Sequence, residues 1–144
     1  MQTNTNIVGF TCGAFDLLHP GHLYLLSRCA DECDKLIVGL HTDPSIERPT
    51  KNRPVQTTLE RYYQLMSLRF VDEVIPYDTE QDLINFLATK SIHKRFLGSD
   101  YSFSQITGEA ICHERGIELV FIPRLHSWSS SELRERLNKC EQQS

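Results

Sequence analysis

The 144-residue sequence lacks the glycine-rich loops of the commonest nucleotide-binding proteins. Its seven glycines include no G-x-G pair, which excludes both the dinucleotide-binding fingerprint and the Walker A loop. A G-x-S-x-G nucleophile elbow is also missing, which weakens a hydrolase interpretation. No apolar run approaches the roughly 20 residues of a transmembrane helix, so we expect no membrane partner.

Charge and cysteine content exclude further classes. Lysine and arginine total 15 against 19 acidic residues, and the net charge of −4 argues against a nucleic-acid partner. The five cysteines are odd in number, and the first residues (MQTNTN) have no basic or long apolar stretch of a secretory signal. We therefore expect free thiols and a cytoplasmic location. Cys29 and Cys33 have no matching pair for a metal site, and we interpret them as core residues.

Apolar periodicity predicts five strands that alternate with five helices. The strands are expected over 7–12, 35–41, 73–76, 94–97 and 117–122, and the helices over 20–33, 57–69, 79–90, 105–115 and 130–139. This alternation predicts an α/β fold with right-handed crossovers: a Rossmann-like, doubly wound domain with a five-stranded parallel sheet. We expect a single domain over 1–144 with a core of about 7–138. Gly116 is expected to end a helix in the left-handed conformation.

Polar clusters occupy the segments that leave the strands, where doubly wound sheets bind ligands. These segments are 13–22, 42–55, 98–103 and 123–131. The first places His19 and His22 three residues apart at a helix start, which carries free amides and a partial positive charge. Gly21 between them has no side chain to keep an anion away. The arrangement suits a phosphate that gains negative charge.

Residues 13–22 (GAFDLLHPGH) resemble the GTFDLLHxGH motif of the H-x-G-H nucleotidylyltransferases, a family of the HIGH-motif superfamily. Further segments are similar to that family's motifs in the same order: Glu60-Arg61, 69–74 (RFVDEV), 98–101 (GSDY), and Arg124 with the serines at 129–131. The resemblance extends from Val8 to about Leu137. The pattern is most similar to the glycerol-3-phosphate cytidylyltransferases, whereas residues 51–55 (KNRPV) resemble the adenylyltransferases that activate heptose phosphates.

The resemblance implies a cytidylyltransferase in which an acceptor phosphate attacks the α-phosphate of CTP and pyrophosphate leaves. A phosphorylated polyol, first of all glycerol 3-phosphate, is the expected acceptor, giving CDP-glycerol or a similar precursor of a cell-surface polymer. The alternative is adenylyl or cytidylyl transfer to a sugar phosphate such as a heptose phosphate. Mg²⁺ would accompany the triphosphate. The resemblance also implies a homodimer with residues 69–74 near the contact.

The resemblance assigns roles to the motif residues. The implied catalytic residues are His19, His22, Lys51 and Arg124. Nucleotide contacts are implied for those two histidines, Arg124, and Gly13, Ala14, Phe15, Gly21, Asp100, Ser129, Ser130 and Ser131. Substrate contacts are implied for Asp16, Lys51, Arg53 and Arg61, and Asp16 is also the first candidate for a Mg²⁺ ligand. Whether Lys51 or Arg53 contacts the phosphates stays open.

Several of these residues have structural alternatives. The two histidines with Asp16 could instead hold a metal ion, and Asp16 alone could brace its turn. Ser129 with Glu132 fits a capping box, and Arg124 could be a surface residue. A nucleotide-binding relative without activity and a metal-dependent hydrolase are the competing classes of function.

Overall fold

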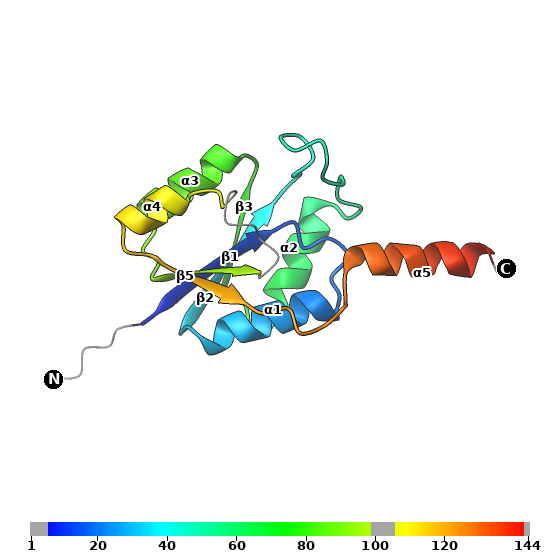
Figure 1. Ribbon diagram of the computed structural model, residues 1–144, viewed down its shortest axis with the longest axis horizontal. Coiled ribbons are helices and arrows are strands. Elements are labelled where there is room, and N and C mark those ends of the chain that lie inside the picture. Colours follow the sequence, from blue (N-terminus) through cyan, green and yellow to red (C-terminus); the bar gives the residue numbers. More distant parts are fainter. Residues whose placement is uncertain (1–5, 99–105, 143–144) are drawn as a thin grey trace.

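The computed structural model describes residues 6–98 and 106–142. Strands and helices alternate through these residues (Figure 1), with bounds β1 (Val8–Gly13), α1 (Pro20–Asp31), β2 (Lys35–His41), α2 (Thr58–Met66), β3 (Glu73–Tyr77), α3 (Glu80–Thr89), β4 (Lys94–Gly98), α4 (Glu109–Glu114), β5 (Glu118–Ile122) and α5 (Ser130–Gln142). The sheet is parallel with strand order β3-β2-β1-β4-β5. The predicted doubly wound, five-stranded fold is confirmed.

Helices cover both faces of this sheet (Figure 1). On one face, Leu26 of α1 and Leu65 of α2 join a core cluster with Val38 and Leu40 of β2. On the other face, α3 and α4 contribute Leu83, Leu87 and Cys112 to a second cluster with Phe10 and Ile37. The strand order reverses at β1, so the carboxyl ends of β1 and β4 form the edge where such folds bind ligands.

Local sequence signals set the helix boundaries. Thr57 and Thr79 each accept a hydrogen bond from the third residue of the following helix, and that residue's carboxylate accepts one from the capping amide. Helix α4 is shorter than predicted because Gly108 adopts a left-handed φ of 80°, which a right-handed helix does not accommodate, so the helix begins at Glu109. Gly116 is left-handed as expected, with φ 69°.

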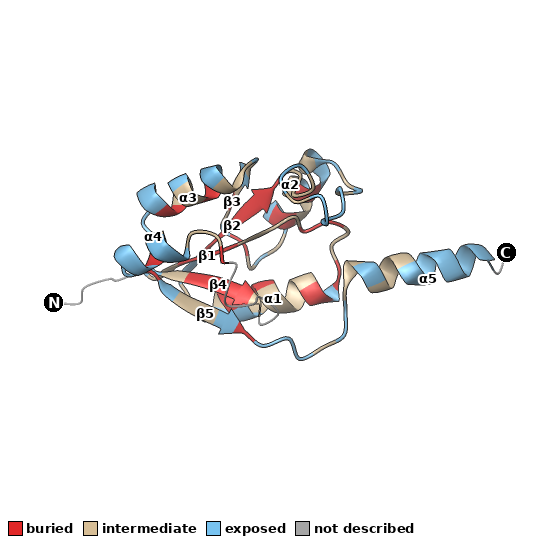
Figure 2. Cartoon of the chain, turned by 45° about the horizontal axis from the view of Figure 1, so that its top comes forward, coloured by how far each residue is buried: buried red, intermediate tan, exposed pale blue. Residues whose placement is uncertain are grey.

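Helix α5 projects away from the body of the molecule (Figure 1). None of its residues is buried, and its surface is almost wholly exposed beyond the first turns (Figure 2). Across the part of the chain that the structure describes, we find no helix long and apolar enough to cross a membrane.

All five cysteines are free thiols, as predicted. Burial raises the pKa of Cys29 to about 12 and also raises the pKa of Cys33, so both remain protonated at neutral pH. These two residues are part of the core around α1.

Candidate active site

The connection from β1 to α1 is a strained turn. Phe15 and Leu17 both have a left-handed φ, of 49° and 52°, although neither is glycine. Such conformations cost of order 1–3 kcal/mol each and persist only where the surroundings enforce them. The side chain of Gln56 accepts a hydrogen bond from the Leu17 amide at 2.9 Å and holds the turn from the neighbouring loop. This turn leads directly to His19, the N-cap of α1.

His19 and His22 form the cap of α1 with their own side chains. Nδ1 of His19 accepts a hydrogen bond from the Gly21 amide at 3.0 Å, and Nδ1 of His22 accepts one from the His19 amide at 3.3 Å. The two rings stack with their centroids 3.8 Å apart. In a neutral imidazole that accepts at Nδ1, the proton lies on Nε2. Each ring therefore has one donor, Nε2–H, for a ligand.

Burial keeps both rings neutral at physiological pH. Loss of solvent, and then the repulsion that a protonated His19 would exert, lowers the pKa of His22 to about 3. The pKa of His19 is also lowered, first by burial and then by His126 and Arg124. Gly21 packs so closely that a Cβ there would lie 2.7 Å from Cε1 of His19. Any side chain at this position would displace the ring.

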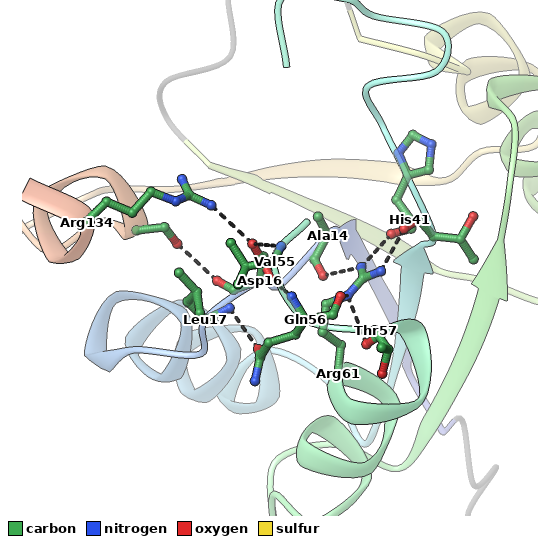
Figure 3. A network of polar contacts seen from close by, with 11 residues as sticks. Ala14, Asp16, Leu17, His41, Val55, Gln56, Thr57, Arg61 and Arg134 are labelled. Atoms are coloured by element: carbon green, nitrogen blue, oxygen red, sulfur yellow. Dashed lines mark hydrogen bonds and ion pairs between the residues drawn. The ribbon is translucent and has the colours of Figure 1, made fainter. Parts of the chain in front are cut away.

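Asp16 ties three segments together (Figure 3). Its carboxylate accepts hydrogen bonds from the amides of Val55 at 2.8 Å and Gln56 at 2.9 Å, and it pairs with Arg134 of α5 at 3.1 Å. The hydroxyl of Ser130 also donates to the Asp16 carbonyl at 3.0 Å. Asp16 thus braces the turn, the loop after β2 and the start of α5.

These contacts bear on the expectation that Asp16 holds Mg²⁺. Three donors already occupy the carboxylate, and the adjacent Arg134 guanidinium offsets the negative charge that would attract a cation. Asp16 in this arrangement does not fit a metal ligand. No group of three or more potential metal-binding side chains occurs within 6–98 and 106–142.

Arg61 is buried and saturated by the backbone (Figure 3). Its guanidinium donates to the carbonyl oxygens of Ala14, His41, Thr42, Gln56 and Thr57 at 2.6–3.3 Å. An acceptor phosphate would have to replace these bonds to contact it. The structure therefore gives Arg61 a positioning role, because it joins the ends of β1 and β2 to the start of α2.

Two cavities meet at His22. The first, of about 350 Å³, lies at the carboxyl ends of β1, β2 and β3, between the loop after β2 and the starts of α3 and α5, and Arg95 of β4 also lines it. The second, of about 290 Å³, lies between the start of α1 and the segment that follows β5. His22 and Ser130 line both cavities. A group bound at His22 would therefore border both cavities.

The predicted residues divide between these cavities. The first is lined by Gly13, Ala14, Phe15, Asp16 and Lys51. The second is lined by His19, Gly21, Arg124 and Ser129. Arg53 lies instead in a separate pocket beside Arg61, so of these two residues it is Lys51 that lines the first cavity. Ser131 is exposed and lines neither cavity, and Asp100 lies outside the described residues.

Two predicted residues of the last loop have structural contacts. The guanidinium of Arg124 donates to the Trp128 carbonyl at 2.7 Å. The Ser129 hydroxyl accepts from the Glu132 amide at 3.1 Å, which is half of the expected capping box. Both side chains border the second cavity, so a structural contact and a ligand contact are compatible there.

Sequence reasoning missed the aromatic wall of the second cavity and the tether on α5. His126 stacks on Trp128 at 5.0 Å and meets Tyr24 edge-on at 5.2 Å. Arg134 lies four residues, about one helical turn, after Ser130 on α5, and its side chain pairs with Asp16. That spacing was a usable signal for Arg134, whereas the aromatic contacts join α1 to a distant loop and have no local signature.

The fold and the paired histidines at a helix start define a nucleotidyltransferase. The chain belongs to the cytidylyltransferase-like family, whose model matches residues 10–136. Bifunctional protein HldE of Nitrobacter hamburgensis is 38% identical over 132 residues, which are 90% of this chain and 26% of the relative. HldE of a Caulobacter species is 40% identical over 134 residues, again 91% of this chain and 27% of the relative. The chain thus spans about a quarter of the length of these relatives.

Solved structures share the fold at lower identity. The lipopolysaccharide core biosynthesis protein of Thermoplasma volcanium has a TM-score of 0.68 at 22% identity, with 86% of this chain and 99% of that chain covered. Thermotoga maritima TmcAL, solved with α-thio ATP, has a TM-score of 0.65 at 13% identity, with 94% and 51% covered. These likenesses support the Rossmann-like architecture.

Proposed function

We propose that the chain transfers an adenylyl or cytidylyl group from a nucleoside triphosphate to a phosphorylated sugar, with a heptose phosphate as the first acceptor to test. The observation that carries this proposal is the pair of neutral imidazoles at the start of α1, with His22 lining two cavities. A nucleotide in one cavity and an acceptor in the other would both reach His22.

The reaction needs no protein nucleophile. An oxygen of the acceptor phosphate forms a bond to the α-phosphorus, and the bond from that phosphorus to the bridging oxygen breaks, so pyrophosphate leaves with the electron pair. The Nε2–H groups of His19 and His22 would donate to the α- and β-phosphate oxygens as charge develops on them. Such preorganised donors are worth about 3–4 kcal/mol each in a transition state. Mg²⁺ would arrive with the triphosphate as part of the substrate.

The two cavities suggest which side each substrate uses. We assign the nucleotide to the second cavity, where Arg124 can hold the pyrophosphate and the His126–Trp128 stack offers an aromatic surface. We assign the acceptor to the first cavity, where Lys51 supplies positive charge for its phosphate. Asp16 and Arg61 hold the walls in place.

A sugar phosphate is favoured over glycerol 3-phosphate for two reasons. Residues 51–55 resemble the segment of heptose phosphate adenylyltransferases, and Lys51 within it lines the first cavity. The relatives described above are bifunctional HldE proteins, and a match to a quarter of their length fits one of two activities.

A pyrophosphate-release screen tests the proposal. The four ribonucleoside triphosphates are each combined with Mg²⁺ and with a heptose 1-phosphate, a hexose 1-phosphate or glycerol 3-phosphate. We expect release with a sugar phosphate and with ATP or CTP, and a nucleoside diphosphate sugar by mass spectrometry. Release without any acceptor would indicate a hydrolase instead. Binding of nucleotide without release for any acceptor would leave a non-catalytic nucleotide-binding protein.

A further inference from the structure

Two buried polar side chains of the first cavity have nitrogen atoms without a partner. Within the described residues, Nε2 of His41 and Nε of Arg95 are shielded from solvent and form no hydrogen bond. The two side chains are 6% and 3% exposed, and both line the cavity. Buried polar atoms are nearly always paired, because leaving one unpaired lowers stability. The arrangement indicates a ligand that supplies the missing partners.

These side chains lie on the other face of the sheet from the histidine pair. His41 ends β2 in register with Tyr77, and their rings stack at 4.6 Å. Arg95 of β4 is in register with Phe10, which belongs to the core under α3 and α4, and it donates to the Thr107 carbonyl at the approach to α4. His22 approaches the same cavity from α1. An acceptor with its phosphate near His22 would therefore extend toward His41 and Arg95.

The chemistry of this region suits hydroxyl groups. A hydroxyl both donates and accepts, so it can pair with an imidazole nitrogen in either tautomer and with the Nε–H of an arginine. Arg48 pairs with Glu80 at 3.2 Å on the same wall, so the charge of Arg48 is already balanced by a carboxylate. A 180° rotation of the His41 ring keeps its plane on Tyr77, so Nε2 can turn toward a ligand without loss of the stacking.

We propose that His41 and Arg95 determine acceptor specificity by binding the ring hydroxyls of the phosphorylated sugar. This inference rests on the proposed transfer to a sugar phosphate and adds the residues that select the sugar.

Substitution of His41 by phenylalanine tests the proposal. His41→Phe keeps an aromatic ring against Tyr77 and removes Nε2, and His113→Phe at an exposed position of α4 is the matched control. We expect the KM for heptose 1-phosphate to rise at least tenfold in His41→Phe, while the KM for the nucleotide stays within twofold. The control should match the wild type in both. If the wild type transfers normally and His41→Phe has the same acceptor KM, the inference is overturned and the proposed function stays intact.

Thermal unfolding gives a readout that does not require turnover. Heptose 1-phosphate, added with a non-hydrolysable nucleotide analogue, should raise the Tm of the wild type and of His113→Phe, and should raise it much less in His41→Phe. Without ligands, His41→Phe should unfold at or above the wild-type Tm, because an unpaired buried atom has been removed. Equal ligand-induced shifts, including none, in wild type and His41→Phe would overturn the inference. A His41-dependent shift without any transfer would show that His41 contacts the sugar phosphate but would refute the proposed function. If the phenylalanine variant fails to fold, Arg95→Met takes its place with the same expected loss.

Discussion

At the scale of single residues, the histidine pair combines two tasks that usually belong to different side chains. Each ring accepts a backbone amide at Nδ1 and keeps Nε2–H for a ligand. The sequence predicted that both histidines face an anion, because H-x-G-H at a helix start is a local pattern. It did not predict that they cap the helix, since the commonest caps are Ser, Thr, Asp and Asn.

Removal of the ligand-facing donors should reduce turnover far more than stability. We expect His19→Asn, which retains a good capping side chain, and His22→Gln, which retains a good third residue for a capping box, to lower kcat at least about a hundredfold. Circular dichroism should show both variants folded. His113→Asn, exposed on α4, is the control. A rate like the wild type's in either variant would remove that histidine from the mechanism.

The lowered pKa of His22 predicts an acid-labile fold. In the unfolded chain His22 takes up a proton near pH 6.5, whereas in the folded chain it does so near pH 3. The unfolded state therefore binds more protons between these values, and the free energy of unfolding falls as the pH falls, by up to about 1.4 kcal/mol per pH unit from this group. Urea titrations at pH 7 and pH 5 should show that the free energy of unfolding falls less in His22→Gln than in the wild type. An equal fall in both proteins would refute the lowered pKa of His22.

At the scale of elements, the loop from β2 to α2 is fixed at its far end by two buried charged groups. Asp16 accepts the amides of Val55 and Gln56, and Arg61 donates to the carbonyls of Gln56 and Thr57. The sequence assigned Asp16 and Arg61 to substrates because both lie in motifs. The hydrogen bonds of Asp16 and Arg61 to distant backbone atoms depend on tertiary packing, which a local sequence pattern cannot predict.

Arg61 should therefore contribute to stability more than to substrate affinity. Arg61→Met would leave several buried carbonyls without a donor, and we expect a loss of about 3 kcal/mol or more in the free energy of unfolding. Arg28→Met, at an exposed position of α1, should change it by less than about 0.5 kcal/mol. Denaturant titration gives both values. If Arg61→Met is as stable as the wild type and only its acceptor KM rises, Arg61 contacts the substrate, as the sequence predicted.

The elements themselves were largely predictable. Strand β2 has the predicted bounds, because a continuous apolar run of that length is typical of a strand covered on both faces. Helix α4 was the largest error in length, and its cause is one glycine whose left-handed backbone stops the helix on its amino side. Periodicity predicts where a helix is possible, whereas a backbone torsion decides where it starts.

At the scale of the whole molecule, a homodimer stays a prediction. Leu59, Tyr63 and Met66 form an exposed apolar stripe on α2, with Leu59 and Tyr63 each 74% exposed. We expect light scattering to give twice the chain mass at micromolar concentration, and Tyr63→Lys to reduce it to the chain mass. Leu137→Lys on α5 is the control, with an exposed apolar side chain outside this stripe. A monomeric wild type would contradict the prediction.

The projecting helix α5 has a practical consequence for experiments in solution. Its Cys140 is exposed, whereas the other four thiols are buried or partly buried. A maleimide dye should therefore react first at this position, far along a rod whose base is joined to Asp16 through Ser130 and Arg134. Fluorescence anisotropy of that label would follow, without any radioactive or coupled assay, how firmly the rod is anchored while substrates enter and leave.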